Sequence, residues 1–212
     1  MKITVTTAKS GRINIFSDGE YRFSIPSDVW FSSRFHDGDN ITDEDLLTIK
    51  KTAGFSFAYD SALRMLGLRA HSKKELERKL SAKYGADETR SAIEKCEKYG
   101  FIDDETFALT FARELFERKN YAPTRIKNEL RQRGISTENI EKAIEALECE
   151  DETGETGISA AVRKLRLPEE LTEKEKARAY RRLLTLGYSY SEIRKALSDF
   201  SFHSVNDDLP PE

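Results

Sequence analysis

The sequence of 212 residues has little cysteine and no long apolar run. Cys96 and Cys149 belong to no CxxC pair and have no adjacent histidine, so neither a disulfide framework nor a zinc site is indicated. No stretch approaches the roughly 20 apolar residues of a membrane-spanning helix. The opening residues MKITVTTAKSG lack the apolar centre of a secretory signal peptide. We expect a cytoplasmic protein with no membrane contact.

A strong excess of one charge is lacking as well. The chain carries 35 Lys and Arg against 38 Asp and Glu, for a net charge of −3. Whole-molecule electrostatics will therefore not draw it to nucleic acid, and any DNA affinity must come from local basic patches. Hydrophobic residues make up 38% of the chain and charged residues 34%. That composition has few core-forming residues for one thick globule and suits an elongated helical protein.

The first 25 residues contain three strand-like runs. Residues 3–6 alternate apolar and polar positions, and residues 12–16 and 20–25 flank Ser17-Asp18-Gly19. A three-residue loop with Gly19 in the left-handed conformation would place Ile15 opposite Tyr21 and Ile13 opposite Phe23, all on one face. Because a strand pair needs one buried face, we predict this register.

Two helices are expected after this β-hairpin. The first covers residues 27–35 and carries Val29 and Trp30 inward, with Phe31 beside them. The second begins at the cap Thr42 and runs to about Lys51.

From Phe55 onward the chain has the pattern of helices with short connectors. Expected spans are 55–69, 73–84, 87–99, 104–119, 123–133, 137–148, 157–166, 172–186 and 190–199. Gly85, Gly100, Gly134 and Gly187 fall where helix ends are expected, and Pro123 falls in a first turn.

One ten-residue pattern occurs three times. The copies are HSKKELERKL from His71, YAPTRIKNEL from Tyr121 and YSYSEIRKAL from Tyr188. Each has a ring residue, a capping position, an aliphatic residue and a leucine four residues later. The aliphatic pairs Leu76/Leu80, Ile126/Leu130 and Ile193/Leu197 have the spacing of one helical face.

The residues around this pattern indicate a repeated helix–turn–helix unit. Ser72-x-x-Glu75 and Ser189-x-x-Glu192 are capping boxes, whereas the middle copy has Ala122-Pro123. Small and large apolar residues recur nine and five positions before each ring residue. These are Ala62, Ala112 and Ala179, and then Leu66, Phe116 and Leu183. Units this small must stack on neighbours to bury their apolar faces.

We therefore predict a mostly α protein in which tandem three-helix, helix-turn-helix-like repeats form an elongated curved stack behind a small β-ribbon region. The predicted parts are a β-hairpin and short-helix region (1–52), repeat 1 (53–100), repeat 2 (101–149), an acidic linker (150–157), repeat 3 (158–202) and a disordered tail (203–212).

At these residues the sequence resembles the RecX family of recombinase regulators. The matching segments are ALRMLGLRAHSKKELERKL (62–80), YGFIDDETFA (99–108), YAPTRIKNELRQRGI (121–135) and, more weakly, LLTLGYSYSEIRKAL (183–197). The β-rich front with FSDGEYRFSI resembles the amino-terminal extension of longer members. The chain departs from the family in its overall acidity and in its long acidic linker.

The resemblance implies a non-enzymatic regulator that binds the RecA–DNA filament. Members of the family are understood to lie in the filament groove and to inhibit RecA recombinase, ATPase and strand exchange in DNA repair, homologous recombination and the SOS response. Some also bind single- or double-stranded DNA directly. A monomer without cofactor is expected.

Asp103-Asp104-Glu105 is the one cluster that suggests catalysis, because paired carboxylates can hold a metal or exchange protons. The alternative is a helix cap, with the neighbouring acids favoured by the helix dipole. No second carboxylate or histidine cluster would complete a site, so we favour the cap and expect no catalytic, metal or cofactor residues. His71 holds the ring position of the repeat, which indicates packing and not ligation.

Basic residues are the most informative charged feature. Residues 113–133 contain seven Lys and Arg against three Glu, whereas residues 136–155 contain eight acids against Lys142 alone. A solvated face is the common explanation of mixed charge, but arginine also suits phosphates and recombinase carboxylates. Candidate partner- or DNA-binding residues are Lys74, Arg78, Arg113, Arg118, Lys119, Arg125, Lys127, Arg131, Arg133, Arg181, Arg182 and Arg194.

Three hypotheses remain open at this point. The first is a negative regulator of a RecA-type recombinase. The second is a helical DNA-binding protein that acts independently of RecA, whose binding should weaken steeply with salt. The third is a nuclease that uses Asp103–Glu105.

Overall fold

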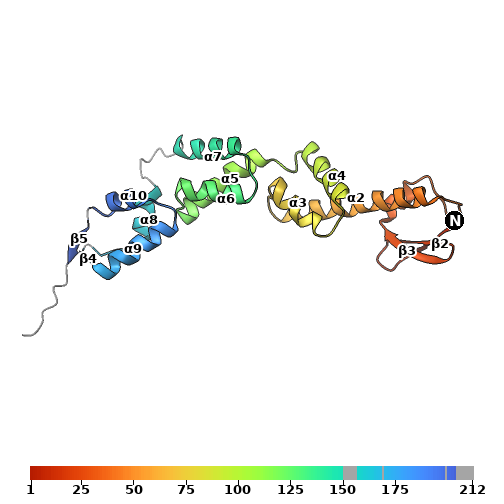
Figure 1. Cartoon of the computed structure of the whole chain (residues 1–212), viewed down its shortest axis with the longest axis horizontal. Coiled ribbons are helices and arrows are strands. Elements are labelled where there is room, and N and C mark those ends of the chain that lie inside the picture. Colours follow the sequence, from red (N-terminus) through yellow and green to blue (C-terminus); the bar gives the residue numbers. More distant parts are fainter. Residues whose placement is uncertain (150–156, 169, 199, 204–212) are drawn as a thin grey trace, which may run out of the picture. The chain divides into compact units, whose positions relative to one another are not determined.

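The structure is a computed structural model that describes residues 1–149, 157–168, 170–198 and 200–203 (Figure 1). The chain divides into two compact units, Met1–Asp103 and Asp104–Glu212, and each is described by itself. Most of the predicted acidic linker and all of the tail beyond His203 lie outside the described residues. None of the helices described is both long and apolar enough to cross a membrane.

A three-stranded antiparallel sheet opens the first unit. Its strands β1 (Ile3–Thr7), β2 (Ile13–Ser17) and β3 (Glu20–Ile25) lie in the order β1-β2-β3. The β2–β3 loop is shorter than predicted, because Ser17 pairs with Glu20 and only Asp18 and Gly19 turn the chain. Both have left-handed backbones, with φ of 51° and 82°, as a two-residue hairpin turn requires.

The predicted strand register is wrong, although its physical premise holds. Ile15 lies opposite Phe23 and Ile13 opposite Ile25, while Tyr21 pairs with Phe16 on the other face. The extra residue that corrects the alternation sits in a β-bulge on β3 and not in the loop. The sheet still has one buried apolar face, because the bulge places Phe23 and Ile25 on the same side as Ile15 and Ile13.

A short helix and a long one complete this region. In α1 (Ser27–Phe31) Val29 and Trp30 are buried as predicted. Phe31 is 77% exposed, so its inward placement is wrong.

The long helix α2 (Asp43–Leu68) replaces two predicted helices. Thr42 and Asp45 form the expected start as a capping box, but the break expected after Lys51 is absent. The helix continues through Gly54. A Cβ at this position would lie 2.9 Å from Cγ of Glu88. The absence of a side chain at Gly54 therefore permits the close approach of α4 (Ala86–Lys98).

Three helical bundles follow the sheet, each with its own buried core. The first bundle combines the end of α2 with α3 (Lys73–Ser81) and α4. The second contains α5 (Asp104–Lys119), α6 (Pro123–Gln132) and α7 (Thr137–Cys149). The third contains α8 (Gly157–Leu165), α9 (Glu173–Thr185) and α10 (Tyr190–Ala196).

The predicted repeat positions form these cores. Leu76, Leu80, Ile126, Leu130 and Ile193 are all 0% exposed, and Leu197 is 1% exposed. In the first two bundles the third helix follows the two that carry the pattern, whereas α8 precedes them in the third. The repeated unit is therefore assembled from a different chain order in its last copy.

Glycine closes three of the helices in the same way. Gly100, Gly134 and Gly187 have positive φ. In each case the amides of the glycine and of the next residue donate to carbonyls in the last turn of the helix, which is the Schellman pattern. Gly85 differs from the expectation, since it is the N-cap of α4 with an extended backbone.

A small parallel sheet was not predicted. β4 (Glu170–Thr172) pairs with β5 (Ser201–His203) beside α9. The predicted tail thus begins within a strand, at His203. Strands of three residues carry too short an alternation to be recognised in a sequence.

Candidate partner-binding surface of the second and third bundles

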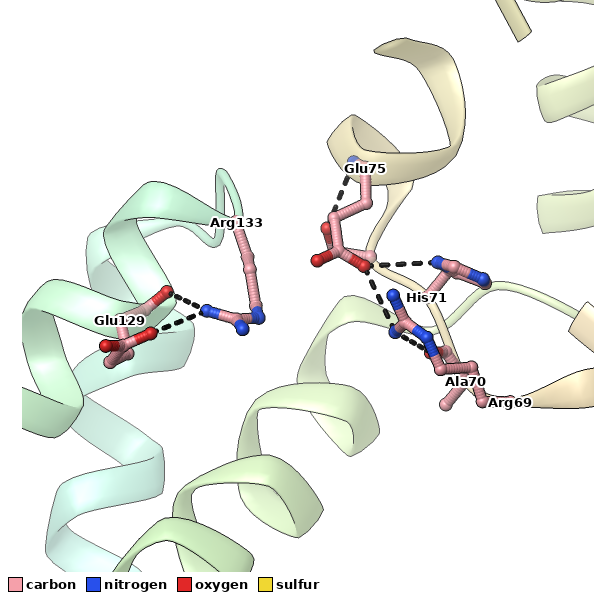
Figure 2. Close-up of polar contacts among 7 residues, drawn as sticks. Arg69, Ala70, His71, Glu75, Glu129 and Arg133 are labelled. Atoms are coloured by element: carbon pink, nitrogen blue, oxygen red, sulfur yellow. Dashed lines mark hydrogen bonds and ion pairs between the residues drawn. The ribbon is translucent and has the colours of Figure 1, made fainter. Parts of the chain in front are cut away.

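The start of α3 is completed by residues next to it in the chain. The Glu75 backbone amide donates to Ser72 Oγ at 3.2 Å, and the Glu75 carboxylate lies 3.1 Å from His71 Nδ1 and 3.4 Å from an Arg69 nitrogen (Figure 2). Burial lowers the pKa of His71, and the neighbouring cations Arg69 and Lys79 act in the same direction. His71 is therefore a neutral packing residue at neutral pH, as its place in the repeat suggests.

The start of α6 is completed by the third bundle. Ala122 and Pro123 offer no side-chain cap. The Ala122 amide instead donates to the Leu186 carbonyl at 2.9 Å, and Thr124 Oγ1 donates to the Gly187 carbonyl at 2.7 Å. The end of α9 and the start of α6 satisfy one another, which explains why the middle copy of the pattern lacks the capping box.

Tyr188 adds a third hydrogen bond between these bundles. Its hydroxyl donates to the Asn120 carbonyl at 3.1 Å. Burial raises the pKa of Tyr188 to about 12, and the charge of Glu192 acts in the same direction. The phenol therefore stays protonated and keeps donating at any physiological pH.

A hollow of about 440 Å³, here called the junction hollow, lies where the second and third bundles meet. The ends of α5, α8 and α9 and the start of α6 form its walls. Its lining residues are Arg118, Lys119, Asn120, Tyr121, Arg125, Ala161, Lys164, Leu165, Arg182, Thr185 and Leu186. Five of them are cationic, and none is a carboxylate.

The cations of the junction hollow are held by aromatic and polar neighbours. The Arg125 guanidinium lies over the Tyr121 ring at 3.9 Å, and Lys119 lies 5.7 Å from the same ring, which are cation–π distances. Lys164 donates to Asn120 Oδ1 and, at 3.5 Å, to the Glu117 carbonyl. These contacts position positive charge without neutralising it.

A second hollow of about 790 Å³, the α9 hollow, shares Leu165, Arg182 and Thr185 with the first. Its further cations are Arg166, Arg178 and Arg181, and Glu175 is its one lining carboxylate. Hydrogen bonds from the Thr172 backbone and side chain lower the pKa of Glu175, because this carboxylate completes the α9 capping box. Because Arg178 and Arg181 of α9 line this hollow together with Arg182, the basic surface continues along α9.

The structure brings five of the predicted binding residues to these hollows, namely Arg118, Lys119, Arg125, Arg181 and Arg182. The other candidates lie elsewhere: Lys74 and Arg78 are exposed on α3, Arg113 on α5, Arg131 on α6 and Arg194 on α10. Lys127 is partly buried on α6. Arg133 also has a local partner, since it bonds the Glu129 carboxylate and carbonyl at 2.9 Å (Figure 2) and lies over Phe111.

Three lining cations were missed from the sequence, namely Lys164, Arg166 and Arg178. The basic run 163–166 (RKLR) was the available signal. Its significance depends on α8 packing beside the start of α6, which no local pattern reveals.

Two family models match segments of the first and second bundles. The family model of the RecX second three-helix domain matches residues 103–144, and that of the first matches residues 58–96. A curated relative, "Regulatory protein RecX" of Salmonella paratyphi B, is 39% identical over 153 residues, which cover 67% of this chain and 90% of the relative. The chain belongs to the RecX family.

Other RecX proteins agree with this assignment. The regulatory protein RecX of Salmonella typhimurium is also 39% identical, with the same coverage. A crystal structure of a regulatory protein RecX covers 93% of this chain and 98% of its own at a TM-score of 0.64 and 23% identity, which shows the fold alone. The crystal structure of RecX from Lactobacillus salivarius covers 69% of this chain and 96% of its own, with a TM-score of 0.55 and 25% identity.

The acidic cluster of this RecX protein lies where a helix begins. Asp103 directly precedes α5, and Asp104 and Glu105 lie in its first turn, where negative charge is favoured by the helix dipole. Glu105 lies 3.4 Å from Lys142 of α7. Among the described residues, no group of three or more His, Cys, Asp or Glu could hold a metal.

Proposed function

We propose that the chain binds the RecA–DNA filament and inhibits RecA recombinase, including its ATPase and strand-exchange activities, in DNA repair and recombination. Membership of a family of regulatory proteins supports this proposal. The observation that carries it further is the continuous basic surface of the junction and α9 hollows. A filament of RecA on DNA offers both phosphates and carboxylates, the two anions that arginine binds best.

In this proposal the chain acts in the cytoplasm as a monomer and by binding alone. Its contacts come from the twelve basic candidates, with the five that line the hollows at the centre. A protein that binds filament or free RecA lowers the amount available for growth by mass action, so inhibition needs no catalytic residue.

The decisive experiment adds the purified chain to RecA, single-stranded DNA and ATP. We expect ATP hydrolysis and strand exchange to fall as the chain is titrated in. The triple variant Arg118→Gln/Arg181→Gln/Arg182→Gln should inhibit less. The control Arg64→Gln/Arg90→Gln removes two exposed arginines of the first unit and should inhibit normally. The double variant Arg181→Gln/Arg182→Gln, which removes the same charge, should inhibit less than this control. Unchanged ATPase and strand exchange at a stoichiometric excess of the wild-type chain would contradict the proposal.

The alternative is a DNA-binding protein that acts independently of RecA, and the same basic hollows favour it. A gel-shift comparison of naked and RecA-coated single-stranded DNA separates the two. Preference for the coated strand supports regulation of RecA, whereas equal affinity with a steep loss in salt supports the alternative.

A further inference from the structure

We propose that the junction hollow is a binding site for a short run of linked phosphates. The same surface serves the proposed function, but this inference stands on the hollow itself. The ligand chemistry could come from a nucleic-acid backbone or from a free oligophosphate, and the two sources can be told apart by experiment.

The first argument is charge. Five cations converge on a hollow of about 440 Å³ that no carboxylate lines. Among the described residues, Lys119, Arg125, Lys164 and Arg182 make no ion pair, and Arg118 has only Glu114 at 3.6 Å. Both members of that pair are well exposed, with side-chain exposures of 77% and 49%, so it neutralises little. A bound polyanion would relieve the repulsion among these cations.

The second argument is that local carbonyls take up little of this charge, since among the described residues Lys164 alone of the five cations donates to a carbonyl, that of Glu117 at 3.5 Å. Helix C-termini such as those of α5, α8 and α9 carry partial negative charge. At the junction the Leu186, Gly187 and Asn120 carbonyls already accept hydrogen bonds from Ala122, Thr124 and Tyr188. The cations of the hollow other than Lys164 therefore remain available as donors.

The third argument concerns what the site would recognise. The Tyr121 ring is covered by Arg125 at 3.9 Å, so that face is closed to a nucleobase. The arginines present forked donors that fit phosphate oxygens in pairs. The volume lies within the range of small-ligand sites, roughly 300 to 1,000 Å³. Phosphate is thus the group that these arginines fit, and the covered face of Tyr121 offers no stacking surface to a base.

The test measures binding of two probes by calorimetry, sodium tripolyphosphate and a single-stranded oligothymidylate. The variant Arg125→Gln/Arg182→Gln removes two forked donors from the hollow. We expect it to weaken binding of at least one probe by about 100-fold, since each charge-assisted hydrogen bond contributes on the order of tenfold. The control Arg64→Gln/Arg90→Gln removes the same charge from the first unit and should bind as the wild type does.

The outcomes with the two probes identify the source of the phosphates or overturn the inference. Loss of both probes supports a phosphate site open to either source, and loss of one probe alone identifies the source. Equal binding by the variant and the control, or no binding of either probe by the wild-type chain, overturns the inference. Circular dichroism of the variant checks its fold, and if it unfolds, the conservative variant Arg125→Lys/Arg182→Lys should retain charge and lose only the forked geometry, binding more weakly than wild type.

RecA is absent from these measurements, so the two proposals fail separately. A wild-type chain that inhibits RecA but binds neither probe overturns the phosphate site alone. A chain that binds the probes but leaves RecA activity unchanged overturns the proposed function alone.

Discussion

The helices α3 and α6 hold the same place in the repeated pattern but begin in different ways. The start of α3 is closed by its own neighbours, Ser72 and Glu75, with His71 and Arg69 on the same carboxylate. The start of α6 has Ala122 and Pro123 instead, and its polar groups are met by the end of α9.

The difference shows that a helix start can be specified locally or by a neighbouring bundle. A locally capped start needs no partner, whereas the start of α6 is complete only when the third bundle is in place. The absence of a capping box from the middle copy of the pattern thus reflects a tertiary contact, the one between the start of α6 and the end of α9.

The largest effect is expected for Gly187→Ala. Gly187 has φ of +98°, and a Cβ there would lie 2.6 Å from the Arg125 Cβ and 3.3 Å from its backbone nitrogen. Backbone strain and overpacking together should lower the free energy of unfolding by about 3 kcal/mol. Gly100→Ala is the matched control, because Gly100 closes α4 with φ of +70° and has open space around it.

That control should lose about 1 kcal/mol from strain alone. Urea unfolding of both variants provides the comparison. Equal losses would mean that the close contact between Gly187 and α6 does not constrain the protein.

A smaller loss is expected for Tyr188→Phe. Removing the hydroxyl leaves the buried Asn120 carbonyl without this donor, which should lower the free energy of unfolding by about 1 to 2 kcal/mol. Tyr190→Phe is the control, because Tyr190 is 65% exposed and should change stability little. Thermal or urea unfolding that fails to distinguish the two variants would count against the hydrogen bond.

Exchange of the capping residues should lower stability at the start of α3 without raising it at the start of α6. Ser72→Ala removes the acceptor of the Glu75 amide and should reduce stability by about 1 kcal/mol. Ala122→Ser should bring no matching gain, because Ala122 is 1% exposed and packs in the core of the third bundle. A stabilised Ala122→Ser variant in urea unfolding would show that α6 lacks only a local cap.

The smallest effect is a pH dependence that belongs to α3 alone. Burial lowers the pKa of His71 in the folded state below its unfolded value of about 6.5. The unfolded chain therefore takes up a proton that the folded chain resists, and stability falls as pH falls below about 7. His71→Tyr, the ring residue of the other two copies, should flatten this slope. Urea unfolding of both chains between pH 7.5 and 5 measures it, and parallel curves would contradict the prediction.

Much of the helical architecture could be predicted because its signals are local. The repeated aliphatic pairs, Pro123 and the glycines after α4, α6 and α9 set helix faces and ends through contacts within a few residues. The predicted span 104–119 is the observed α5. The predicted domain boundaries remain predictions, since the compact units and family matches divide the chain by different criteria.

The remaining features depend on contacts between distant residues. The sequence did not predict that α2 continues past Lys51 and through Gly54, where Glu88 of α4 packs against it. The β-bulge could not be told from a longer loop by alternation alone. The hollows show the same limit. Arg125 and Arg182 were predicted as binding residues, but their convergence with Lys164 requires α8 and α9 to pack beside α6.

The helix α2 has a consequence for how the first unit opens. Ile49 and Ala53 of this helix belong to the core beneath the sheet, whereas Ala62 belongs to the core of the first bundle. Figure 1 shows α2 running from the sheet to α3 and α4. Because both cores hold turns of one continuous hydrogen-bonded helix, we expect amide exchange along α2 to be slow and nearly uniform, without a step at Gly54. The sheet and the first bundle would then share one opening event.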